Sequence, residues 1–231
     1  MNPVLFARIL CRKLCLFGAC AIVATGAEPL LSTGPAATPE AGTRSSTDPW
    51  VTLGSVRVNS ETRSMLVTGW VNQVFGLVEL LACGPGGKTH ESVFVLEASP
   101  VDFQAGLLLL GIKPGTPPRD VGEGQPKGPE LDIWVDWKDG AKNRRERAER
   151  FIVDIRNQKP LPATPWIFTG SVFEDGKFMA LAEESLIATY WDPWAIINIP
   201  LPCGADDTLL VVNTNAVPPL NTPIQMQIKA R

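Results

Sequence analysis

Histidine is almost absent from this chain, since His90 is the only one among 231 residues. A single imidazole excludes a His-Glu-x-x-His zinc motif and any multi-histidine metal site. It also leaves no spare base for a serine nucleophile of the Gly-x-Ser-x-Gly type. The sequence lacks a Gly-x-Gly-x-x-Gly fingerprint and a full Gly-x-x-x-x-Gly-Lys-Ser/Thr phosphate loop. The sequence therefore lacks the residues that most common hydrolases, zinc enzymes and nucleotide-binding proteins use.

Cysteines are also few, and three of the five lie within the first 27 residues. The other two, Cys83 and Cys203, are far apart in sequence, which excludes a Cys-x-x-Cys redox motif and an iron–sulfur ligand run. In an oxidising compartment they could form a disulfide, which would stabilise the fold by roughly 4–5 kcal/mol. Two buried free thiols are the alternative.

Long apolar runs are missing except near the N-terminus. Arg8, Arg12 and Lys13 precede an apolar run over residues 14–24, and small residues follow at positions 25–27. This order predicts a signal peptide over residues 1–27 and export to the periplasm or cell envelope. The run is shorter than the roughly 20 residues of a membrane-spanning helix, so no transmembrane span is expected after signal removal. As an alternative, Cys20 ends a segment that resembles a lipobox and would then carry a lipid anchor.

The formal net charge is −3, and removal of the three leader cations leaves a mature chain of −6. An acidic exported protein has no electrostatic reason to bind nucleic acid, so we expect no nucleic-acid partner.

Residues 28–49 are rich in Pro, Ala, Thr and Ser and predict a flexible linker. Residues 50–231 then contain many short apolar runs separated by Pro, Gly, Asn and Asp. These runs predict a mainly β (α+β) fold: a single sheet-rich domain of about ten short strands with one or two helices packed on the sheet. The strands are expected at 51–58, 65–71, 75–83, 90–97, 131–137, 151–155, 166–173, 177–182, 186–190, 196–199, 209–212 and 224–228.

One segment has helical signals. Ser99 before Pro100 predicts a helix over residues 100–110, with Val101, Ala105 and Leu108 facing the sheet. The Gly- and Pro-rich stretch that follows, 113–130, predicts a long loop that is either functional or mobile.

A hairpin predicted around the glycine-rich turn at residues 84–88 would bring Glu79, His90 and Glu91 together. A carboxylate in the apolar run at Glu79 needs a partner, because burial of a lone charge is costly. Neighbouring residues in a strand face opposite sides, so the register decides whether His90 or Glu91 shares the face of Glu79. The cluster is either a metal or acid/base site, or a polar group satisfied inside the sheet with Lys88 nearby.

Tryptophan is abundant, with seven residues in the chain. Trp191 and Trp194 flank an aspartate, and residues 134–137 repeat this arrangement, which is found on sugar-binding surfaces. Glycan binding with Trp191 and Trp194 facing the ligand is one hypothesis, and core packing is the other. The arginine-rich run at 144–150 also contains glutamates, which predicts a solvated face.

Several segments taken together resemble the YdjY-domain family of exported bacterial proteins. They are Gly69-Trp70-Val71-Asn72, Glu79-Leu80-Leu81-Ala82-Cys83, Gly87-Lys88-Thr89-His90-Glu91-Ser92, residues 105–115, residues 166–171 and residues 213–215. The resemblance extends over about residues 50–228 and implies that Glu79, His90 and Glu91 belong to a family motif. The family has no established activity. Members with an added cysteine-rich ferredoxin-like segment differ from this chain, which lacks those cysteines.

These observations favour an exported, non-catalytic domain that binds an unknown envelope component and needs no cofactor. The alternative is a metal-dependent or acid/base enzyme that uses Glu79, His90 and Glu91, for which a divalent metal would be the cofactor.

Overall fold

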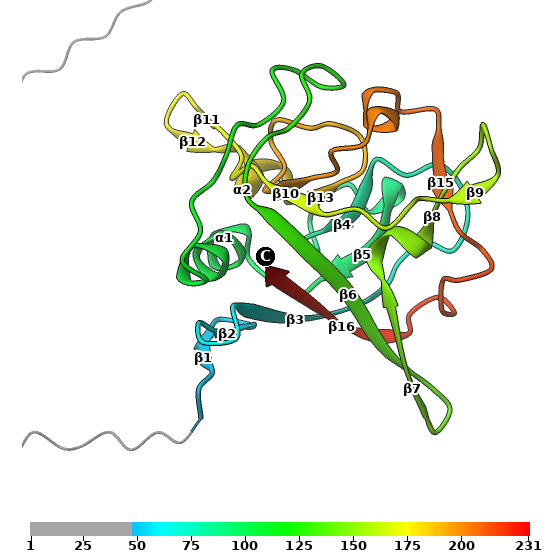
Figure 1. Cartoon of the computed structure of the whole chain (residues 1–231), viewed down its shortest axis with the longest axis horizontal. Helices are drawn as coiled ribbons and strands as arrows, with labels where there is room; N and C mark the ends of the chain where they lie inside the picture. Colours follow the sequence, from blue (N-terminus) through cyan, green and yellow to red (C-terminus); the bar gives the residue numbers. More distant parts are fainter. Residues whose placement is uncertain (1–47) are drawn as a thin grey trace, which may run out of the picture. The chain divides into compact units, whose positions relative to one another are not determined.

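The computed structural model describes residues 48–231, and strands dominate it (Figure 1). The predicted leader, nearly all of the linker, and Cys20 lie outside the described residues. The mainly β prediction is confirmed, with two short α-helices, α1 (Pro100–Leu109) and α2 (Met179–Glu183). Three 3₁₀ turns are η1 (Thr89–Glu91), η2 (Ala148–Phe151) and η3 (Pro202–Ala205). The strands are β1 (Val51–Leu53), β2 (Val56–Asn59), β3 (Ser64–Val71), β4 (Leu80–Cys83), β5 (Ser92–Leu96), β6 (Glu130–Asp139), β7 (Lys142–Arg147), β8 (Ile152–Asp154), β9 (Lys159–Pro160), β10 (Trp166–Phe168), β11 (Phe173–Glu174), β12 (Lys177–Phe178), β13 (Ser185–Ala188), β14 (Ile197–Asn198), β15 (Leu210–Val212) and β16 (Pro223–Ala230).

The main sheet closes into a ring. Its strands follow in the order β3, β16, β6, β10, β14, β13, β4 and β5, and β5 pairs again with β3. Most neighbours are antiparallel, but β4 with β5 and β13 with β14 are parallel. Strands β1 and β2 extend the sheet beyond β3, and β7 forms a long hairpin with β6 that projects away from the ring (Figure 1).

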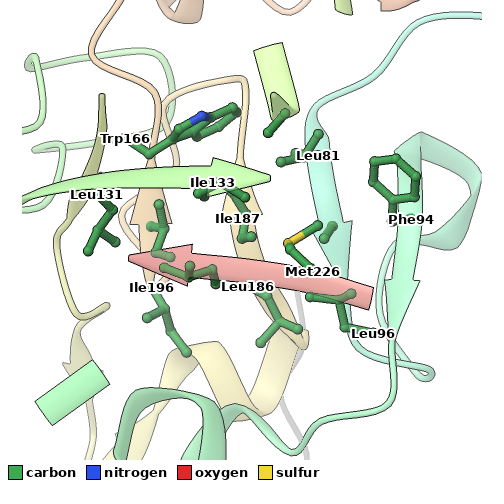
Figure 2. Packing of buried hydrophobic residues seen from close by; sticks show 14 of the residues in the cluster. Leu81, Phe94, Leu96, Leu131, Ile133, Trp166, Leu186, Ile187, Ile196 and Met226 are labelled. Atoms are coloured by element: carbon green, nitrogen blue, oxygen red, sulfur yellow. The ribbon is translucent and has the colours of Figure 1, made fainter. Parts of the chain in front are cut away.

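The interior of the ring is filled by apolar side chains, which alternate with outward-facing residues along β6 and β16, whereas β4, β5, β10 and β13 are buried at every position. On β6, Leu131, Ile133 and Val135 are buried, while the residues between them face outward. Figure 2 shows Leu131 and Ile133 of β6 together with Met226 of β16 and Trp166 of β10 in this core. Full burial of each large side chain contributes roughly 1.5–3 kcal/mol, so the core accounts for most of the stability of the ring.

Helix α1 begins and ends close to the predicted positions, and Ser99 caps it by accepting a hydrogen bond from the Val101 amide. The predicted contact face is wrong, however. Val101 and Leu108 are about half exposed, whereas Phe103 and Leu107 are fully buried. Apolar residues lie all around this helix, so their spacing alone does not identify the buried face.

The predicted hairpin between residues 75 and 97 is also wrong, because β4 and β5 run parallel. Leu80 lies opposite Ser92, and Cys83 lies opposite Val95. The glycine-rich segment between the strands is a short crossover that ends in η1, not a hairpin turn. The strands predicted at 51–58 and 65–71 do form a hairpin, since β2 and β3 pair antiparallel around residues 60–63.

The long segment between α1 and β6 has contacts along its length. Thr116 bridges to Lys127, and the Gly122 amide donates to the Trp191 carbonyl at 2.8 Å. A Cβ atom on Gly122 would meet the Tyr190 ring, which explains the need for glycine at this contact. Among residues 48–231, no helix is long and apolar enough to span a membrane.

Candidate functional site

Glu79 directly precedes β4 and is partly buried beside the crossover loop. Its Oε2 accepts a hydrogen bond from Lys88 Nζ at 3.2 Å. Its backbone carbonyl accepts hydrogen bonds from the amides of Thr189 and Tyr190, and its own amide donates to the Glu91 carbonyl. The carboxylate in this apolar run therefore has the partner that its burial requires, and that partner is Lys88.

Glu91, and not His90, shares the surroundings of Glu79. Burial and the neighbouring Glu91 carboxyl raise the pKa of Glu79, and Lys88 opposes this shift. The Glu91 Oε2 atom is buried without a hydrogen-bond partner, so a proton on Glu79 would supply the missing donor. His90 points outward with its side chain 75% exposed, and its Nε2 lies 3.0 Å from Glu91 Oε1.

The space beside the Glu79 carboxyl is very small, although a separate hollow of about 400 Å³ lies next to His90. A hollow of about 10 Å³ lies between Glu79, Lys88, Tyr190, Asp192 and Trp194. A buried water needs roughly 10–15 Å³, so the hollow has room for about one water and none for a substrate. Burial raises the pKa of Asp192, although its Oδ1 accepts a hydrogen bond from the Trp194 amide at 2.8 Å.

The glycine-rich crossover binds a carboxylate of the protein itself. The Gly84 amide donates to the Glu184 carbonyl at 2.9 Å, and the Gly86 amide donates to Glu184 Oε2 at 2.6 Å. The loop ends in Gly87-Lys88-Thr89, which is the ending of a phosphate loop, but Ala82 stands where the motif has its first glycine. Because Glu184 occupies an amide that a phosphate would need, and only a 3₁₀ turn follows, the loop offers no free phosphate site.

Metal-ligating side chains do not converge in the described part of the chain. No group of three or more His, Cys, Asp or Glu residues between positions 48 and 231 could hold a metal ion. Cys83 and Cys203 are buried free thiols, which matches the second of the two alternatives for this pair. Burial raises the pKa of both thiols.

The two tryptophans proposed to face a ligand have structural contacts. Trp191 is buried, and its indole N–H donates to the Ile199 carbonyl at 2.8 Å, which excludes a ligand-facing role for this residue. Trp194 is partly exposed, and its indole donates to Glu174 Oε1 at 2.9 Å. Asp192 between them orders the turn, because it binds the Trp194 amide and its own amide donates to Asn198.

Lys88 lies beside Glu79, where the sequence led us to expect it, whereas Asn72 has a role that the sequence did not reveal. The Asn72 side chain donates to the carbonyls of Thr89 and Ser92, and so holds the crossover in place. Both residues lie in the motif segments that carry the family resemblance. That pattern marks them but does not say what they contact.

The model of one family, the YdjY domain, matches residues 56–229, which is most of the chain and nearly all of the described part. The chain belongs to the YdjY domain family. No curated protein and no solved structure matches it. The match includes the polar cluster around Glu79, the ring and the projecting hairpin.

Much larger hollows of the YdjY domain flank its β6–β7 hairpin. A groove of about 740 Å³ lies between the hairpin and the loop over residues 215–222, and a second of about 600 Å³ lies on the side of β16. Volumes of this size are typical of ligand sites. Trp137, Asn143 and Arg144 line both grooves.

The hairpin is fixed at its base and open at its tip. Arg147 donates to Asp132 and to Glu149 at 2.9 Å each, and its guanidinium stacks over the Trp134 ring. The Glu149 side chain is only 1% exposed. The rest of β7 is exposed, as predicted for the mixed-charge run, and its ion pairs there include Arg144 with Asp139.

Proposed function

We propose that this protein is exported to the periplasm or cell envelope, where its YdjY domain binds an envelope component and catalyses no reaction. The small hollow beside Glu79 is the observation that carries the proposal. A reaction centre needs space for a substrate next to its titratable groups, and Glu79 has space for about one water beside it. The hollow of about 400 Å³ next to His90 is lined by neither Glu79 nor Glu91. The grooves at the β6–β7 hairpin lie among other residues and have the size of a ligand site.

The second candidate is a metal-dependent or acid/base enzyme that uses Glu79, His90 and Glu91. The raised pKa of Glu79 favours it, because perturbed carboxyl groups are frequent in active sites. The contact between His90 and Glu91 also favours it, since a carboxylate beside an imidazole is a common catalytic pair. The same features also arise in structural ion-pair networks.

Elemental analysis of the protein lacking residues 1–27 separates the two candidates. We expect no stoichiometric divalent metal, and we expect Glu79→Ala to lower the free energy of unfolding because Lys88 and Glu91 lose a partner. The surface variant Glu61→Ala is the matched control and should leave stability unchanged. Stoichiometric metal that both Glu79→Ala and His90→Ala abolish, in folded protein, would contradict the binding proposal.

Export is tested by the mass of the mature protein in a cell that carries the full sequence. We expect a chain that begins at Glu28 in the periplasmic fraction. A chain that begins at an acylated Cys20 would favour the lipid-anchored alternative and still agree with export. An intact leader on a cytosolic protein would contradict it.

A further inference from the structure

Positive charge is concentrated in one short segment of an acidic protein. Residues 138–150 contain six cations and three carboxylates, whereas the other residues in the range 48–231 contain eleven cations and nineteen carboxylates. The hairpin and the turn after it are therefore a basic region on an otherwise acidic surface. Such asymmetry attracts an anionic partner to one place and repels it elsewhere.

Hydrogen-bond donors without partners face the larger groove. Within the described residues, the side chains of Lys138, Asn143, Arg150 and Asn215 line this groove, and none of them forms a hydrogen bond or an ion pair with another protein group. Glu146 is the one carboxylate lining the groove without such a partner, since Asp139 is paired with Arg144. The groove therefore offers mainly donors, which suits a ligand rich in acceptor oxygens.

The walls of the groove are held in position by buried contacts. Asn213 is buried, and its side-chain Nδ2 donates to the Arg150 carbonyl at 2.7 Å. Its backbone N–H donates to the Phe151 carbonyl. This fixes the backbone around Arg150 and Asn215 relative to each other. Trp137 packs edge-to-face against Phe151, with ring centroids 5.9 Å apart, so its indole has a fixed orientation. A preformed site loses little entropy when a ligand binds.

We propose that this groove binds an acidic polysaccharide, with Arg150 and Lys138 on its carboxylate or sulfate groups and Asn143 and Asn215 on its hydroxyl groups. A guanidinium forms paired hydrogen bonds with such acid groups. A membrane surface fits less well, because the hairpin tip at residues 139–142 has an acid and no large apolar side chain to insert. This inference rests on the proposed binding function and assigns its ligand class.

Binding of defined polymers to the protein lacking residues 1–27 tests the proposal. The probes are polygalacturonate for carboxylates, dextran sulfate for sulfates, neutral dextran for the sugar backbone alone, and polyglutamate for a polypeptide anion. We expect binding to at least one acidic polysaccharide, no binding to dextran, and weakening as salt is raised through about 0.1 M. Preference for polygalacturonate or for dextran sulfate identifies the acid group, and either preference supports the proposal.

Variants localise the binding. Arg150→Gln removes an exposed side chain without a partner and should weaken binding about tenfold or more. Lys113→Gln removes the same charge outside the groove and should leave affinity within about twofold. Three results would overturn the proposal. They are an equal loss of affinity in both variants, no binding of either acidic polysaccharide, and binding of polyglutamate as strong as that of the acidic polysaccharides. None of these outcomes bears on the metal analysis, so the non-catalytic assignment stands or falls separately.

Discussion

Gly69 tests the closure of the ring, because it lies in β3 opposite Leu96 where β3 pairs with β5. A Cβ at this position would overlap the carbonyl oxygen of Val95 and lie 3.0 Å from the Leu96 Cα. Both obstacles are backbone atoms, so Gly69→Ala must push the two strands apart. Overpacking costs about 1–3 kcal/mol, and each weakened hydrogen bond adds about 1 kcal/mol. We expect a loss of about 3 kcal/mol or more, which lowers the Tm by about 6–12 °C for a domain of this size.

Thermal and urea unfolding followed by circular dichroism measure this loss, and Gly106→Ala is the matched control. A Cβ on Gly106 would lie 2.5 Å from the Sδ of Met65 and 3.1 Å from the Cγ1 of Val56, so the atoms closest to it belong to side chains and not to backbone, and the nearest of these side chains is flexible. Alanine also favours the helix by about 1 kcal/mol, so the control should stay within about 1 kcal/mol of the parent protein. If Gly69→Ala is as stable as the parent, or loses less than Gly106→Ala, the reasoning about ring closure is refuted.

Three further predictions concern buried charge and the thiols. Arg147→Ala should lower the free energy of unfolding in urea by about 3 kcal/mol, because it leaves the buried Glu149 without its ion-pair partner. Arg144→Ala breaks an exposed ion pair and should lower it by less than about 1 kcal/mol. Equal losses in the two variants would contradict this prediction. Burial raises the pKa of Asp192, so the folded state binds this proton more tightly than the unfolded state, and stability from this group is lost as pH rises above about 3.8. The free energy of unfolding of Asp192→Asn should therefore rise relative to that of the parent protein as pH increases, by about 1.4 kcal/mol for each pH unit by which burial raises the pKa of Asp192. Parallel pH profiles of the two proteins would contradict this expectation. The two buried cysteines should react slowly with a thiol reagent in the folded protein and rapidly after unfolding in guanidinium without reductant; no reactive thiol after unfolding would indicate a disulfide.

The sequence predicted the features that depend on local pattern. Short apolar runs between Pro, Gly, Asn and Asp identified most strands, and the Ser99 cap with Pro100 identified the start of α1. The unfavourable position of Glu79 in an apolar run also indicated a polar partner nearby. These signals lie within a few residues of one another, which is why they can be recognised without the fold.

Features set by distant contacts were predicted wrongly. The glycines at positions 84 and 86 suggested a hairpin turn, but a Cβ at either would meet the Glu184 side chain, almost one hundred residues away. The buried face of α1 is determined by the close approach of Gly106 to Met65 and Val56, which the apolar pattern of the helix does not reveal. The register that pairs Glu79 with Glu91 follows from the parallel β4–β5 pairing and was out of reach for the same reason.

We propose that Glu79 belongs to a closed polar network and not to a reaction or metal centre. This can be tested by titrating its carboxyl carbon by ¹³C NMR, with the signal assigned through Glu79→Gln and the titration repeated with excess zinc or manganese. We expect a midpoint above 4.5 that the metal does not change. A midpoint at or below 4.5, or a signal that the metal shifts or broadens at stoichiometric concentration, would contradict it.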